Sequence, residues 1–201
     1  MNLPKYKYLI TYRLAEITYD LTVALCSRFL LSNSLSNLGN LGTLGVFPNR
    51  RTADQMIQAS RSEKQNIIEA VSEIASLKSQ IKLLGISYAS GEELTADFED
   101  FLRRNNLKIY QKDDPRITRF RQIGRHLSSI GNLSHLGNQI EKPVLLNNPE
   151  EAANFILTLL HQLSYLLKQQ ILQAEKKFIN QGSYSEQLFQ KRLDKRNESK
   201  G

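Results

Sequence analysis

RRTADQMIQASRSEKQNIIEA, residues 50–70, has the residue spacing of a helix that packs into a bundle. One face follows steps of four and three, interrupted by one lysine, at Ala53, Ile57, Ser60, Lys64, Ile67, Val71 and Ile74. A second face keeps the same rhythm with polar side chains, at Gln55, Gln58, Ser62, Gln65 and Glu69. An apolar stripe at this spacing predicts a helix that buries one side. The amides of the other side could join helices or subunits, or contact phosphates and bases.

Similar stripes on both sides of this segment predict further helices. We expect them at about Tyr6–Leu31, Ala75–Arg104, Pro115–Ile130 and Pro149–Gly182, with a short basic helix after them. In that last helix, Leu188, Phe189 and Leu193 would form the docking side. Two loops rich in Asn, Leu and Gly, at 32–49 and 131–143, interrupt the pattern. No alternating strand pattern competes, so the sequence predicts an all-α, up-and-down four-helix bundle with a C-terminal helical extension.

Composition narrows the class of protein. The 201 residues include no Trp, 5 Pro and one cysteine, Cys26, so an internal disulfide is not possible and a cytoplasmic location is expected. No apolar run approaches the roughly 20 residues of a membrane helix, and no signal peptide is recognisable. We therefore expect no membrane association.

Charge is concentrated in one short stretch. Residues 103–126 hold eight basic and two acidic side chains, while the whole chain has a net charge of +7. Asp114 and Pro115 mark a helix start, and Arg116, Arg119, Arg121 and Arg125 follow within ten residues. Because guanidinium groups bind phosphate oxygens bidentately, these four arginines are the main candidates for nucleic-acid contacts. A solvated helix face is the simpler alternative.

Catalytic and cofactor motifs are missing from the sequence. The three histidines, His126, His135 and His161, are far apart, and no nucleophile, zinc or phosphate-loop motif occurs. Glu93, Asp97 and Asp100 share one helix face and could in principle hold a metal, although a solvated or inter-subunit acidic face is the better interpretation. We expect neither an enzyme nor a cofactor.

Three stretches resemble a known family. RRTADQMIQASRSEKQNIIEA and SQIKLLGISYASGEELTADFEDFLRR (residues 79–104) resemble the bacterial four-helix bundle family. That family includes proteins encoded in intervening sequences of 23S ribosomal RNA genes and the accessory variability proteins of diversity-generating retroelements. Residues 148–193 are similar to the C-terminal suffix of a longer subgroup. The resemblance divides the chain into a four-helix core at 1–131 and a suffix helix with a basic tail at 132–201.

The resemblance also implies assembly and partners. Such proteins form homo-oligomeric rings, typically pentamers, and the retroelement proteins bind a reverse transcriptase and nucleic acid through basic surface. Three residues depart from the family pattern. Glu63 and Lys64 stand where small or variable residues are expected, and Gly91 stands where an apolar residue is usual.

Together these observations predict a non-enzymatic, oligomeric bundle that binds RNA or DNA and assists a ribonucleoprotein or mobile-element machine. The candidate contacts are the four arginines above, with Arg51, Arg61 and Lys64 on the helix of the opening stretch. The alternative is a protein-interaction scaffold, in which the acidic face at 92–100 pairs with the basic stretch at 103–125 of a neighbouring copy.

Overall fold

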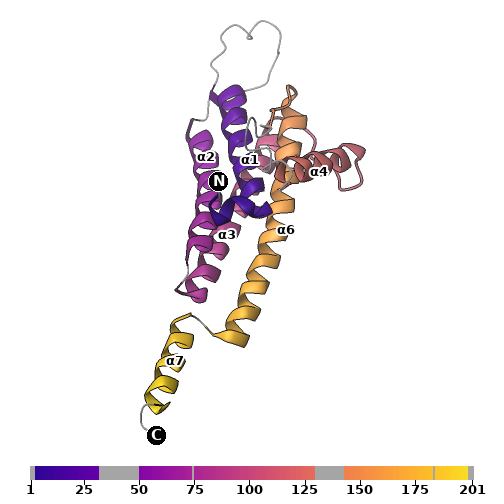
Figure 1. Cartoon of the computed structure of the whole chain (residues 1–201). Helices are drawn as coiled ribbons and strands as arrows, with labels where there is room; N and C mark the ends of the chain where they lie inside the picture. The colour runs from indigo at the N-terminus through magenta and orange to yellow at the C-terminus, as the bar shows by residue number, and fades with distance from the viewer. Residues whose placement is uncertain (1–2, 32–49, 74, 130–142, 183, 199–201) are drawn as a thin grey trace, which may run out of the picture.

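The protein is an all-α bundle with a C-terminal extension (Figure 1). The structure, a computed structural model, describes residues 3–31, 50–73, 75–129, 143–182 and 184–198. In chain order the elements are the 3-10 helix η1 (Lys5–Tyr8), α1 (Ile10–Leu25), the π-helix η2 (Cys26–Leu31), α2 (Arg50–Ser72), α3 (Leu77–Arg104), α4 (Pro115–Ser128), α6 (Pro149–Gln181) and α7 (Tyr184–Glu198). The two Asn/Leu/Gly-rich loops predicted from the sequence lie outside the described residues.

Four long helices form the bundle. Helix α1 packs against α2 and α6, and α3 packs against the same two, which closes a ring of four. The chain direction alternates from α1 to α2 to α3 to α6, as in an up-and-down bundle (Figure 1). The fourth helix of the ring is α6 and not the helix at 115–130, which the division at residue 131 had placed in the core. Helix α6 falls in the segment that the sequence assigned to the suffix, yet Ala152–Leu160 of α6 lie in the common core.

The buried face of α2 differs by about one residue from the predicted one. Met56, Glu63 and Ala70 are fully buried, whereas the predicted Ile57 and Val71 are only partly buried. A glutamate in the middle of the inward face hides the true pattern, because ionisable residues rarely mark a core position. Both carboxylate oxygens of Glu63 lack a hydrogen-bond partner within the described residues.

Local signals at the ends of α4 and α6 are confirmed. Asp114 caps α4, where its side chain accepts a hydrogen bond from the backbone N–H of Arg116 at 2.9 Å. Asn148 caps α6 in the same way, with Pro149 in the first turn. Gly182 ends α6 with a φ of 67°, a left-handed conformation that glycine adopts without strain. These caps depend on adjacent residues only, so the sequence predicts them well.

The last part of α6 and all of α7 extend beyond the bundle (Figure 1). Helix α7 buries none of its residues. The expected docking of Leu188 and Phe189 is not found, because their side chains are 41% and 62% exposed. None of the described helices is both long and apolar enough to cross a membrane.

Candidate nucleic-acid interface

Helix α4 lies across α6 on one side of the bundle (Figure 1). Phe120 of α4 and Phe155 of α6 pair with ring centroids 5.2 Å apart. Gly124 brings the helices close together: a Cβ at this position would lie 2.5 Å from Leu159 Cδ2. The apolar side of α4 is thereby buried on α6, and its remaining faces are left for solvent.

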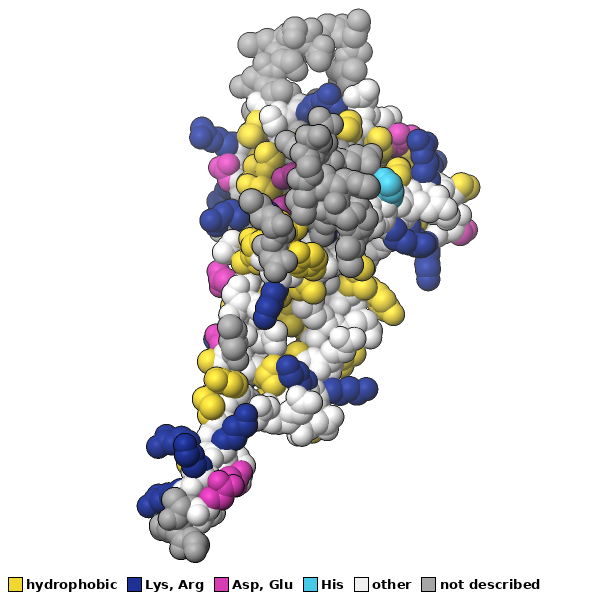
Figure 2. Space-filling model, viewed as in Figure 1, with side chains coloured by type: hydrophobic (Ala, Val, Ile, Leu, Met, Phe, Trp, Pro, Cys, Tyr) yellow, Lys and Arg dark blue, Asp and Glu magenta, His cyan; other side chains and the backbone are white. Residues whose placement is uncertain are grey.

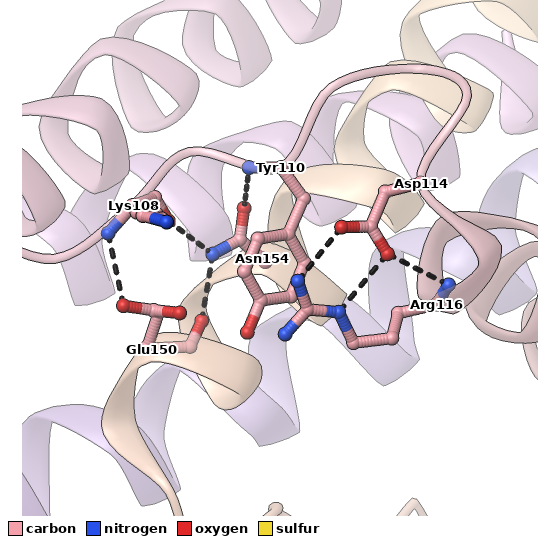
Figure 3. Close-up of polar contacts among 6 residues, drawn as sticks. All are labelled: Lys108, Tyr110, Asp114, Arg116, Glu150 and Asn154. Carbon is pink, nitrogen blue, oxygen red and sulfur yellow. Dashed lines mark hydrogen bonds and ion pairs between the residues drawn. The ribbon is translucent and has the colours of Figure 1, made fainter.

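The segment between α3 and α4 is held against α6 by Glu150 and by the amide side chain of Asn154 (Figure 3). Its Oδ1 accepts from the backbone N–H of Tyr110 at 2.8 Å, and its Nδ2 donates to the carbonyl of Lys108 at 2.8 Å. Glu150, one turn earlier on α6, accepts from the N–H of Lys108 at 3.0 Å. Asn154 is 1% exposed, so these bonds form away from water and fix the position of residues 108–110.

Arg116 is engaged within this same segment (Figure 3). Its Nε and Nη2 donate to Asp114 at 2.9 and 2.7 Å, and its guanidinium carbon lies 3.5 Å from the centroid of the Tyr110 ring. The hydrogen bonds from Arg116 lower the pKa of the Asp114 carboxyl to about 2. Burial, together with Glu150, raises the pKa of Tyr110 to about 12, so this phenol stays neutral at physiological pH. Arg116 therefore orients Tyr110 and completes the helix cap.

A cleft of about 570 Å³ opens where these parts meet. It is lined by Tyr110 and Lys112 of the connecting segment, Ile117 and Arg121 of α4, and Thr158, His161, Gln162 and Tyr165 of α6. Tyr110, Ile117 and Thr158 are at most 8% exposed and form the floor, whereas Tyr165 is 63% exposed at the rim. Among the described residues that line the cleft, none carries a carboxylate. The site therefore combines an apolar floor with a basic and aromatic rim.

The four predicted arginines of α4 do not lie on one surface. Arg121 lines the cleft, and Arg125 lies one turn further along the same flank. Arg119 is two residues from Arg121 and so projects from a different side of the helix. Within the part of the chain that the structure describes, Arg121 and Arg125 form no ion pair with a carboxylate. Figure 2 shows Lys and Arg side chains around the projecting α4.

The three candidates on α2 are also dispersed. Lys64 faces α1, where its Nζ lies 3.9 Å from the centroid of the Tyr19 ring. Arg51 lies on the opposite flank, in a groove between α2 and α3. Arg61 is exposed to solvent. The seven candidate residues thus occupy several separate surfaces, of which the Arg121–Arg125 flank is the one beside a cleft without acidic groups.

Part of the polar face of residues 50–70 lines the groove between α2 and α3. It has a volume of about 720 Å³ and is lined by Arg50, Arg51, Asp54, Gln55, Gln58, Ala59, Ser62, Ser90 and Glu93. The hydroxyls of Ser62 and Ser90 are hydrogen-bonded at 3.0 Å. Asn66 does not reach the groove, because it donates back to the carbonyl of Ser62 at 2.8 Å. Basic and acidic side chains share this groove.

The acidic face of α3 is partly neutralised within its own helix. Asp100 accepts from Arg103 at 2.7 Å and pairs with Arg104 at 3.3 Å, and the hydrogen bond from Arg103 lowers the pKa of Asp100. Within the described residues, no group of three or more His, Cys, Asp or Glu side chains is arranged to hold a metal ion. The metal alternative for Glu93, Asp97 and Asp100 therefore gains no support.

Of the residues that line the cleft, only Arg121 was a predicted contact, and the sequence did not indicate the rim residues Lys112 and Tyr165. Lys112 precedes the helix cap and looked like part of a general basic run, and Tyr165 occurs in the apolar stretch of α6. Tyr165 could have been identified from its position in the helical repeat, since it lies between the buried Leu163 and Leu167 on the outer side of the helix.

Comparisons of the chain with protein-family models, with curated proteins and with solved structures give no match.

Proposed function

We propose that this protein binds RNA or DNA through the α4–α6 cleft and the adjoining Arg121–Arg125 flank. The observation that carries the proposal is the cleft's lining, in which Lys112 and Arg121 stand at the rim and no carboxylate is present. Polyanions are attracted to such a surface, and phosphate contacts from Arg and Lys supply most of the affinity of sequence-tolerant binding. A role as a non-enzymatic accessory in a ribonucleoprotein or mobile-element machine would use this surface.

The proposal also covers the oligomeric state and the membership of the resembled family. Exposed apolar side chains on the extended part of the molecule, Ile179 and Phe189 among them, offer contacts for a homo-oligomer, which in the resembled family is a pentameric ring. A reverse transcriptase is the partner that this resemblance suggests. The interaction-scaffold alternative is less favoured, because Asp100 already pairs with Arg103 and Arg104 of its own helix.

The test measures binding of single-stranded RNA and DNA at several salt concentrations. Removing two phosphate contacts with Arg121→Ala/Arg125→Ala should weaken binding to every sequence. It should also reduce the slope of log affinity against log salt by about 1.4. Arg125 is exposed and Arg121 lies at the rim of the cleft, so the helical circular dichroism should not change.

The matched control is Arg61→Ala/Arg119→Ala, which removes the same charge from exposed positions away from the cleft. It should leave the salt slope close to that of the wild type. Equal losses in both double variants would refute the assignment to this flank. Full affinity in Arg121→Ala/Arg125→Ala would remove the site altogether.

A further inference from the structure

The α4–α6 cleft has a feature that phosphate binding does not require, namely an apolar floor beneath an exposed aromatic ring. Ile117 and Tyr110 are 7% and 8% exposed, and Thr158 turns its hydroxyl away to donate to the carbonyl of Asn154 at 2.8 Å. Tyr165 stands at the rim with 63% of its surface exposed. A phosphate backbone alone would leave this floor and this ring without a partner.

The rim supplies the complementary polar groups. Lys112 comes from the connecting segment, Arg121 from α4 and His161 from α6, one turn before Tyr165. The cationic groups of Lys112 and Arg121 therefore lie on two sides of an apolar and aromatic surface, and His161 adds a polar ring. This combination matches a molecule with a flat aromatic part and a negatively charged part.

From this arrangement we infer that the cleft binds an unpaired nucleotide, with its base against Tyr165 and the apolar floor and its phosphate at Arg121 and Lys112. The inference rests on the proposed nucleic-acid binding and narrows it to single strands. In a duplex both faces of each base are covered by neighbouring bases, so the floor and Tyr165 would gain nothing. A volume of about 570 Å³ lies in the range typical of small-ligand sites.

The walls of the cleft are held in place before any ligand binds. Asn154 fixes the Tyr110 backbone, Arg116 stacks on the Tyr110 ring, and Gly124 sets the close approach of α4 to α6. Binding would therefore order few protein side chains beyond Lys112, Arg121 and Tyr165. A preformed site of this kind loses less conformational entropy on binding.

The experiment compares three labelled probes of equal length: a single-stranded oligonucleotide, the same backbone with abasic sites, and a duplex. Stacking on one aromatic side chain is worth enough to change affinity about tenfold. We expect wild-type protein to prefer the single strand over the abasic backbone by about that factor. The Tyr165→Ala variant should lose this preference and bind the abasic probe as the wild type does.

The matched control is Tyr184→Ala, which removes another exposed tyrosine, 48% exposed, from α7. It should keep the preference for bases. Competition by a free nucleoside monophosphate, compared with the same amount of inorganic phosphate, shows whether the cleft accepts a nucleotide outside a strand. Competition by the monophosphate alone supports a nucleotide site open to free ligands, and no competition by either supports a site that takes nucleotides within a strand.

The outcomes separate the two proposals. Equal binding of the single strand and the abasic backbone, with dependence on Arg121 and Arg125, would overturn the nucleotide site and leave electrostatic binding intact. A tenfold loss in Tyr165→Ala on both probes would also overturn it, because the ring would then act through something other than a base. No binding of any probe would overturn both proposals.

Discussion

The α2–α3 and α4–α6 interfaces place their charged groups in opposite ways. Between α2 and α3 a carboxyl group, that of Glu63, is buried in the interface, and the solvent-facing groove above carries Arg50 and Arg51 with Asp54 and Glu93. Between α4 and α6 the buried contact is made by Phe120 on Phe155 without a buried carboxyl group among the described residues, and the cleft outside carries basic groups without acidic ones.

The comparison shows that the electrostatic surroundings of an arginine depend on its neighbours in space. The sequence makes both Arg51 and Arg121 candidates for nucleic-acid contacts, with Arg121 among the main ones. In the folded chain Arg51 shares its groove with two carboxylates, whereas Arg121 shares its cleft with a lysine, a histidine and two tyrosines. The first site is close to neutral and the second is positively charged.

The largest expected effect concerns the ionisation of Glu63. Burial, with a smaller contribution from Glu92, raises the pKa of Glu63 from 4.5 to about 8. Between these values the folded state binds more protons than the unfolded state, so stability should fall as the pH rises from 4.5 to 8. Glu63→Gln removes the ionisation and should increase the free energy of unfolding at pH 8 by up to about 5 kcal/mol, with little change at pH 4.

Urea denaturation of wild type and variant across this pH range measures the effect. Glu99→Gln, which changes an exposed glutamate of α3, serves as the control and should show no such divergence with pH. Parallel stability profiles for wild type and Glu63→Gln would mean that the Glu63 carboxylate ionises in the folded bundle at little cost.

Glu63 and Gly91, two of the three residues noted above as departures from the resembled family, meet in this interface. A Cβ on Gly91 would lie 2.3 Å from Glu63 Oε1, so the missing side chain of one residue makes room for the other. Gly91→Ala should therefore destabilise the bundle by about 1 to 3 kcal/mol through overpacking, although alanine normally favours a helix. In a Glu63→Ala background this cost should disappear, which a double-mutant cycle on thermal unfolding would detect.

Gly85, two turns earlier on α3, is the matched control because a Cβ there would meet no atom within 4 Å. Gly85→Ala should stabilise the protein by about 0.5 to 1 kcal/mol, since it only reduces the backbone freedom of the unfolded chain. A destabilisation of the same size at both glycines would mean that close contact with Glu63 is not what restricts position 91.

Much of the fold could be predicted from the sequence because its signals are local and periodic. Leu84, Leu94 and Phe98 mark the inward side of α3, and Leu160, Leu163 and Leu167 that of α6, as their spacing predicts. Glu63 could not be predicted as a core residue, because its burial depends on the absence of a side chain at Gly91, 28 residues away.

The cleft was predictable only in part. The basic stretch at 103–126 identified Arg121 and Arg125, but charge alone does not separate them from Arg116, which is engaged by Asp114 and Tyr110. The cleft brings together Lys112 and Tyr165, which are more than fifty residues apart in the sequence. The contacts by which Asn154 fixes the segment between α3 and α4 span a similar sequence separation. A single sequence contains no signal for contacts at this range.

A change in affinity tests directly whether neighbouring carboxylates determine how an arginine contributes to binding. Asp54→Asn/Glu93→Gln removes both carboxylates from the α2–α3 groove and leaves Arg50 and Arg51 in place. If charge balance is what separates the two sites, the variant should bind single-stranded nucleic acid about three- to tenfold more tightly at low salt. Glu69→Gln/Glu99→Gln makes the same change of net charge at exposed positions outside this groove, so its gain should be smaller. Equal gains would show that net charge alone sets the affinity, and the distinction between the two interfaces would then lose its functional meaning.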